Sequence, residues 1–147
     1  MAVTISIATS ADAEELTRAL QHLVPQLSAS NPPPSLEAVR AMLDHDSITQ
    51  FVARRDDGSI AGVSTLAAFP IPTGTRGWVE DVIVDEASNN QGIGRMLLDA
   101  MVGRARELGC RTVDLTSRPS REAANHLYRA AGFVERETNV YRFTLRS

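Results

Sequence analysis

The clearest candidate for chemistry in this sequence is a glycine-rich turn, Gln91-Gly92-Ile93-Gly94, which opens a run with the periodicity of a helix. Where a strand passes through such a turn into a helix, several backbone N–H groups are exposed at the positive end of the helix dipole. The turn therefore predicts a site for a phosphate or pyrophosphate, with side-chain donors added by Gln91 and Arg95. The alternative interpretation is that the glycines only let the helix pack closely against its strand.

Two common phosphate-binding fingerprints do not fit this turn. Leu97 stands where a dinucleotide-binding turn has its third glycine or alanine. The Gly-Lys-Ser/Thr ending of a Walker P-loop is also missing. The turn thus indicates an anion site of another kind.

Strands and helices alternate along the chain in a pattern that could position this turn. Apolar periodicity of two predicts strands over residues 3–7, 48–55, 60–69, 78–84, 111–116, 133–135 and 140–145. Periodicity near 3.6 predicts helices from Thr9 or Ser10 to Leu27, over 36–43 after a Ser35 cap, from the glycine-rich turn to Leu108, and over 121–131. The order β-α-α-β-β-β-α-β-α-β-β predicts one mixed α/β domain over residues 1–147.

Glycines and prolines that interrupt helices or strands refine this pattern. Asp57-Gly58 predicts a hairpin between the second and third strands. Pro25 is expected to bend or end the first helix, and four breakers predict a loop over residues 69–77: Pro70, Pro72, Gly74 and Gly77. Residues 28–34, which end in three prolines, are expected to form a stiff connector.

Composition narrows the class of protein. The chain has 147 residues, 43% of them hydrophobic, and a net charge of −3, so no global positive field would attract nucleic acid or an anionic membrane. The single cysteine, Cys110, excludes a disulfide framework and favours a reducing cytoplasm. We expect a soluble cytoplasmic protein, because the start of the chain has no leader pattern and no apolar run reaches membrane length.

Two motifs at a fixed separation carry a family resemblance. The first motif is Val82-Ile83-Val84, which is followed after six residues by Gln91-Gly92-Ile93-Gly94-Arg95 and then by Leu97-Leu98. The second motif is Leu127-Tyr128-Arg129-Ala130-Ala131-Gly132-Phe133. This half of the chain resembles the GCN5-related N-acetyltransferases (GNAT), and the first half is similar in element order. The resemblance implies a mostly antiparallel sheet flanked by helices, and acetyl-CoA as co-substrate without a metal.

By position in that family, Val82, Ile83 and Val84 would bind the pantetheine arm. The pyrophosphate would be bound by Asn89, Asn90, Gln91, Gly92, Ile93, Gly94 and Arg95. The family usually has Arg or Gln followed by Gly where this chain has the two asparagines, which tolerate left-handed turn conformations. Asn125 is expected to contact the cofactor, and Arg121 on the same helix face is a second candidate.

Acetyl transfer to an amine needs a base, an oxyanion donor and an acid. Tyr128 matches the family's general acid, since a phenol of pKa about 10 can protonate a thiolate; its other interpretation is an aromatic ring that covers the core. Glu80 is expected to share a strand face with Val82 and Val84 and to accept the amine proton, or else to be merely solvated. The resemblance implies a backbone N–H at Val82 or Ile83 as the oxyanion donor.

These residues predict an acetyl-CoA-dependent N-acetyltransferase acting on a primary amine in a ternary complex. A cationic amine is favoured by the acidic residues Glu80, Asp81 and Asp85, and the resemblance also allows a homodimer. The rival hypothesis is a non-catalytic acyl-CoA-binding or regulatory module, and a longer acyl chain or a hydroxyl acceptor also stays open. No metal site is expected, because the three histidines lack ligand spacing: His22, His45 and His126.

Overall fold

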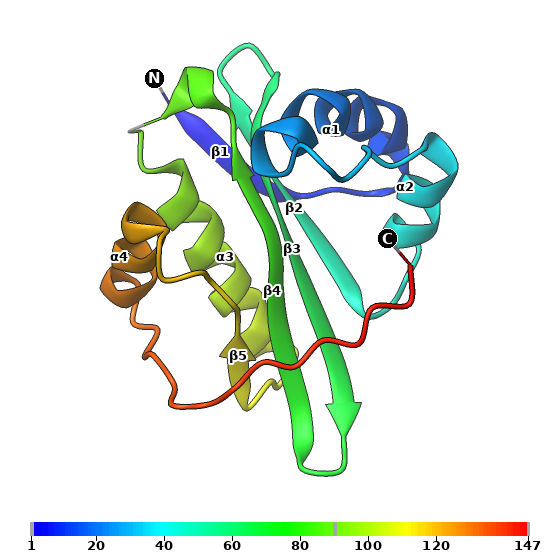
Figure 1. Ribbon diagram of the computed structural model, residues 1–147. Helices are drawn as coiled ribbons and strands as arrows, with labels where there is room; N and C mark the ends of the chain where they lie inside the picture. Colours follow the sequence, from blue (N-terminus) through cyan, green and yellow to red (C-terminus); the bar gives the residue numbers. More distant parts are fainter. Residues whose placement is uncertain (1, 90, 147) are drawn as a thin grey trace. The chain divides into compact units, whose positions relative to one another are not determined.

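A computed structural model describes residues 2–89 and 91–146 (Figure 1). The chain divides into two compact units, Met1–Thr116 and Ser117–Ser147. Within the described residues, no helix is long and apolar enough to cross a membrane.

The first unit is built on a mixed five-stranded sheet in the order β1-β2-β3-β4-β5 (Figure 1). Its elements are β1 (Val3–Ile7), α1 (Ala13–Leu27), α2 (Leu36–Leu43), β2 (Ile48–Arg55), β3 (Ile60–Ile71), β4 (Gly74–Val84), α3 (Ile93–Glu107) and β5 (Thr112–Asp114). Two short 3₁₀ helices, η1 (Ser10–Asp12) and η2 (Glu86–Ser88), precede α1 and α3. The first three strand pairs are antiparallel and β4–β5 is parallel. The predicted α/β class and mostly antiparallel sheet are therefore confirmed.

Helices cover both faces of this sheet. On one face, the apolar stripes of α1 and α2 pack against the sheet, with Leu16 and Val39 meeting Val52, Val63 and Ile83 in one buried cluster. Gly62 is the neighbour of Val63 and so points to the other face. A Cβ at Gly62 would lie 3.4 Å from the side chains of both Ile93 and Leu97, so α3 covers that face.

Several local predictions are confirmed because local contacts decide them. Ser35 caps α2 by accepting a hydrogen bond from the Ala38 N–H at 3.1 Å. Gly58, at φ +86°, forms the turn of the β2–β3 hairpin. Gly109, at φ +76°, follows the end of α3.

Pro25 does not end α1, which continues to Leu27, since a proline near the end of a helix disrupts few backbone hydrogen bonds.

The predicted loop over residues 69–77 is wrong. β3 and β4 form a long hairpin there, in which Pro70 pairs with Thr75 and Ile71 with Gly74. The last β2–β3 pair is Ile48–Ala67, so at Pro70 β3 has a strand neighbour only on the β4 side. A proline is tolerated in such a position because its missing N–H can face away from the ladder.

The second unit contains α4 (Glu122–Ala130), followed by Gly132 at φ +101°. The two final strands predicted over 133–135 and 140–145 are not formed, and the described residues 133–146 contain no strand. Alternation of apolar residues indicates a two-sided segment, but a strand also needs a partner for its backbone groups. β5 is also shorter than the predicted strand over 111–116.

Candidate functional site

A β-bulge interrupts β4 beside the predicted catalytic carboxylate. Thr65 pairs with Glu80 and Val63 pairs with Ile83, so β4 advances three residues while β3 advances two. The extra residue lies next to Asp81, which has a positive φ of +46°. A bulge of this kind reverses the alternation of side chains along the strand.

This reversal corrects one expectation about Glu80. Ile83 lies opposite Val63 and belongs to the core beneath α1 and α2, so Glu80, opposite Thr65, lies on that same face. Val84 pairs with Gly62 and points to the α3 face. Glu80 therefore shares a face with Ile83 and not, as the period of two predicted, with Val84.

The last residues of β4 have an edge without a strand partner. Pairing with β5 covers only Arg76, Gly77 and Trp78, so within the described chain the β5-side edge of β4 is unpaired from Val79 onward. An unpaired strand edge offers backbone N–H and C=O groups to an extended ligand. Residues 82–84, the predicted pantetheine site, lie on this edge.

Glu80 is exposed but held in place by its neighbour on the same face. Trp78 donates its indole Nε1–H to Glu80 Oε2 at 2.7 Å, and the Trp78 ring is half-buried. This bond occupies one carboxylate oxygen and leaves the other for a ligand or a water. Trp78 thus orients Glu80.

The glycine-rich turn enters α3 through a left-handed glycine. Gly92 precedes α3 in the left-handed conformation, with φ +75° and ψ +14°. Nothing lies within 4 Å of a Cβ placed there, so close packing is not what requires this glycine. The Met96 N–H donates to the Gly92 carbonyl at 3.1 Å. In an α-helix, the N–H groups of the first turn have no carbonyl partner within the helix itself. Arg95 pairs with Asp99 at 3.0 Å on the surface of α3.

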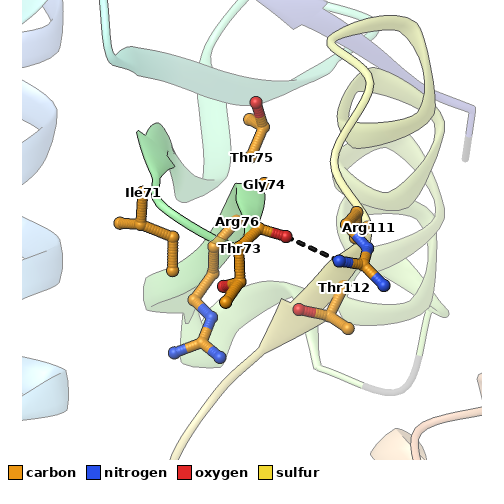
Figure 2. A pocket seen from close by; sticks show the side chains of 7 residues that line it. All are labelled: Ile71, Thr73, Gly74, Thr75, Arg76, Arg111 and Thr112. Carbon is orange, nitrogen blue, oxygen red and sulfur yellow. Dashed lines mark hydrogen bonds between the residues drawn. The ribbon is translucent and has the colours of Figure 1, made fainter.

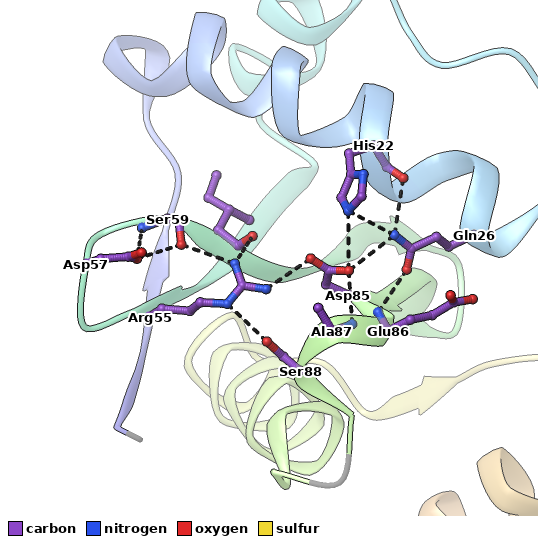
Figure 3. Close-up of polar contacts among 10 residues, drawn as sticks. His22, Gln26, Arg55, Asp57, Ser59, Asp85, Glu86, Ala87 and Ser88 are labelled. Atoms are coloured by element: carbon purple, nitrogen blue, oxygen red, sulfur yellow. Dashed lines mark hydrogen bonds and ion pairs between the residues drawn. The ribbon is translucent and has the colours of Figure 1, made fainter.

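Between the end of β4 and this turn, Asp85 is fixed from two other elements (Figure 3). Arg55 of β2 donates to Asp85 Oδ2 at 3.0 Å, and Gln26 of α1 donates to Asp85 Oδ1 at 3.3 Å. His22 Nε2 also lies 3.3 Å from Asp85 Oδ1, and the Ala87 N–H donates to the same oxygen. Burial by itself would raise the pKa of Asp85, but these hydrogen bonds outweigh it and the pKa is lowered.

Arg55 and Gln26 also bind residues 86–88, which follow Asp85 (Figure 3). Arg55 Nε donates to the buried Ser88 Oγ at 3.0 Å, and Gln26 Oε1 accepts from the Glu86 N–H at 3.0 Å. Residues 85–88 are thereby fixed just before the glycine-rich turn. Sequence reasoning missed Arg55 and Gln26, since no local motif links them to residues 30 and 59 positions away. It also counted Asp85 as a charge that favours a cationic substrate, whereas Arg55 neutralises it.

The remaining predicted residues belong to the second unit. Asn125 Nδ2 donates to the Arg118 carbonyl at 2.9 Å and so closes the turn that leads into α4. Tyr128 packs edge-to-face against Phe133, with ring centroids 6.2 Å apart. Arg121 is exposed at the N-cap of α4. The candidate residues therefore form two groups, one in each unit.

A hollow in the first unit lies at the other end of β4 from the predicted site. It has a volume of about 200 Å³ and is lined by Ile71, Thr73, Gly74, Thr75, Arg76, Arg111 and Thr112 (Figure 2). Arg111 donates to the Thr73 carbonyl across it. None of the predicted site residues lines this hollow.

The first unit thus combines a mixed sheet, a strand edge that is unpaired from Val79 onward within the described residues, and a glycine-rich helix start. The chain matches the model of the acetyltransferase (GNAT) family over residues 16–133, and it belongs to this family, as the sequence predicted. Membership identifies it as an enzyme of the N-acetyltransferase class, and the family uses acetyl-CoA as its co-substrate.

Two relatives carry acetyltransferase names, and one solved structure shares the fold. A mycothiol acetyltransferase from Propionibacterium freudenreichii is 35% identical over 60% of this chain, which spans only 28% of that relative's length. A glucosamine 6-phosphate N-acetyltransferase from Oryza sativa is 29% identical over 86% of this chain and 79% of its own. An acetyltransferase-like protein from Agrobacterium tumefaciens has the same fold, with a TM-score of 0.81 and 24% identity over 98% of this chain and 99% of its own.

Proposed function

We propose that this protein transfers an acetyl group from acetyl-CoA to a primary amine of a small molecule or peptide. The observation that carries the proposal is the unpaired edge of β4, which leads through the fixed residues 85–88 into the glycine-rich turn. One extended ligand with a phosphate group near one end would use both features. The relative named for glucosamine 6-phosphate supports an acceptor of small size.

Acetyl-CoA would lie along this edge. Its pantetheine arm would pair with residues 82–84 as an added strand, and its pyrophosphate would accept hydrogen bonds from backbone N–H groups between Asn89 and Arg95. Asn90, which belongs to the same proposed set, lies outside the described residues. Asn125 would contact the cofactor from α4.

The reaction would proceed by direct attack in a ternary complex. The amine nitrogen forms a bond to the thioester carbon while the C–S bond breaks. Glu80 accepts the proton that the amine loses, directly or through a water, and a backbone N–H at Val82 or Ile83 stabilises the oxyanion. Tyr128 gives a proton to the departing thiolate.

This mechanism requires residues from both units, so we propose that residues 1–147 work as a single domain. The family match supports this, because residues 16–133 extend across both units. A cytoplasmic location stays a prediction, supported by the unpaired Cys110 thiol. A homodimer also stays a prediction.

The rival hypothesis, a non-catalytic acyl-CoA-binding module, predicts binding without turnover. The bond from Trp78 to Glu80 favours the enzyme, because a binding module would not need an oriented carboxylate beside the cofactor edge. Release of free thiol from acetyl-CoA separates the two hypotheses. It would be measured across polyamines, amino sugars, aminoglycosides, amino acids and peptides.

Binding itself is tested by a thermal shift. Acetyl-CoA at one hundred times its Kd should add about 2.7 kcal/mol to the free energy of unfolding. Gly94→Glu, which places a carboxylate in the anion site, should abolish that shift. The matched control is Gly103→Glu on the same helix, where nothing lies within 4 Å of the added Cβ, and the shift should persist. A wild-type protein that shows no shift would contradict the proposal.

A further inference from the structure

The hollow at the β3–β4 hairpin is positively charged, although the chain as a whole has a net charge of −3. Two arginines line it, Arg76 of β4 and Arg111 just before β5, and none of the described residues that line it is acidic. Its volume of about 200 Å³ is below the roughly 300–1,000 Å³ of sites for drug-sized ligands. A small anion fits this size and this charge.

Arg111 is positioned over the hollow by two contacts. Its Nη1 donates to the Thr73 carbonyl at 2.6 Å. A Cβ at Gly74 would lie only 2.5 Å from Arg111 Cδ, so the arginine stem occupies space that a side chain at position 74 would need. Among the described residues, only Nη1 of this guanidinium has a hydrogen-bond partner. Its Nε and Nη2 therefore keep their N–H groups for a ligand.

Arg76 lines the same hollow from the neighbouring strand. It pairs in register with Thr112 of β5, so the two side chains lie on the same face of the sheet. Arg76 Nε lies 3.5 Å from Asp114 Oδ2, and these side chains are 45% and 35% exposed. An ion pair this exposed is weak, and it leaves both terminal nitrogens of Arg76 able to bond elsewhere.

The donors of the hollow surround one common space. Figure 2 shows the two arginine side chains on opposite sides of the hollow. The hydroxyls of Thr73 and Thr112 lie between them in the same view. Two guanidinium groups and two hydroxyls thus offer hydrogen bonds to one small acceptor.

We propose that this hollow binds a phosphate group. A phosphate presents three strong acceptor oxygens even when it is esterified, so it can bond to both guanidinium groups and to a hydroxyl. The planar fork of an arginine matches phosphate oxygens two at a time. A carboxylate has only two oxygens and would leave part of the donor set unused. The site lies at the other end of β4 from the acetyl-CoA edge and does not depend on the proposed function.

The test follows the two arginines directly. Sodium phosphate, glycerol 3-phosphate and sodium acetate are titrated into the protein without acetyl-CoA at about pH 7, where a phosphate monoester carries about −1.5 to −2 charges. Sodium chloride at matched ionic strength is the salt control, and the Nε–H signals of Arg76 and Arg111 are followed by NMR. Both phosphate compounds should shift both signals to saturation, and acetate and chloride should not. Whichever phosphate compound binds more tightly identifies the source, inorganic phosphate or a phosphate ester.

Three variants distinguish a built site from general attraction by positive charge. Arg111→Lys keeps the charge but loses the planar fork, so phosphate affinity, read at Arg76, should fall about tenfold. Arg40→Lys is the matched control, since Arg40 pairs with Glu14 on the surface, and it should leave the affinity unchanged. Asp114→Asn removes the carboxylate that competes for Arg76 and should raise the affinity about two- to fivefold.

A further variant separates this hollow from the glycine-rich turn, which could also attract phosphate. Gly94→Glu blocks that turn and should leave the shifts of both arginine signals intact. Loss of those shifts in Gly94→Glu would assign the phosphate to the turn and overturn the inference. Equal shifts with acetate or chloride, or unchanged affinity in Arg111→Lys, would overturn it as well.

Discussion

Replacing Arg55 by methionine should destabilise the protein and weaken acetyl-CoA binding together. The guanidinium donates to Asp85 and Ser88 at 3.0 Å each, to Ser59 Oγ at 3.1 Å and to the Ile60 carbonyl at 3.2 Å. The side chains of Arg55 and Asp85 are only 18% and 11% exposed, so the variant leaves a mostly buried carboxylate without its cation. Breaking such a pair costs about 3–5 kcal/mol. We expect about 3 kcal/mol, the lower end of that range, because Gln26, His22 and the Ala87 N–H still contact Asp85.

The pH dependence of this loss has a definite sign. The pKa of Asp85 is lowered in the folded protein, so its stabilising contribution is present above the pKa of the unfolded chain, about 3.9. That contribution disappears as the pH falls through the folded pKa. The difference in stability between wild type and Arg55→Met should therefore be largest near neutral pH and shrink on acidification below about pH 4.

The expected effect on acetyl-CoA affinity follows from the fixed backbone of residues 85–88, just before the glycine-rich turn. Arg55 holds residues 85–88, and fixing the backbone of one residue costs about 1–2 kcal/mol. If binding must restore that order, the Kd for acetyl-CoA should rise about tenfold. Calorimetric titration under conditions where the variant is folded separates this effect from lost stability.

Arg54→Met is the matched control on the same strand. Arg54 pairs with Glu15 at 2.8 Å, and these side chains are 25% and 42% exposed, so urea unfolding should show a loss of about 1 kcal/mol or less. Its acetyl-CoA affinity should equal that of wild type. Arg55→Met combined with Asp85→Asn should cost less than the sum of the single changes. Additive single changes, or an Arg55→Met protein with unchanged acetyl-CoA affinity, would refute the reasoning.

Two further substitutions test the proposed proton transfers. Tyr128→Phe preserves the edge-to-face packing on Phe133 and removes only the hydroxyl, so turnover should fall by about 10²-fold with little change in acetyl-CoA affinity; wild-type turnover would remove Tyr128 from the mechanism. Glu80→Gln can still accept the Trp78 N–H bond but cannot take up a proton, so turnover should fall more than acetyl-CoA binding and should partly recover at higher pH, where more of the amine is neutral. A pH–rate profile identical to that of wild type would leave Glu80 as an orienting or solvated carboxylate.

The elements of the first unit, and part of the candidate site, could be predicted from the sequence because short-range interactions decide them. The Ser35 cap and the Asp57-Gly58 hairpin act within a few residues, and α2 and β2 have the predicted bounds. The glycine-rich turn is also local, since a strand, a left-handed glycine and a helix start occur in series. This turn and the motif over residues 127–133 together led to the family assignment.

Other features depend on residues far apart in the chain, and only the tertiary structure decided them. The bulge at Asp81 places Glu80 on the Ile83 face, and it arises from the register with β3, which periodicity in β4 alone cannot reveal. Apolar alternation after Phe133 did not produce strands, because pairing requires a partner as well as a pattern. Sequence alone determined which residues could do chemistry. The long-range contacts of Arg55 with Asp85, and of Arg111 with Thr73, decided how their side chains are oriented, because a hydrogen-bond partner in another element leaves no periodic signal in the chain.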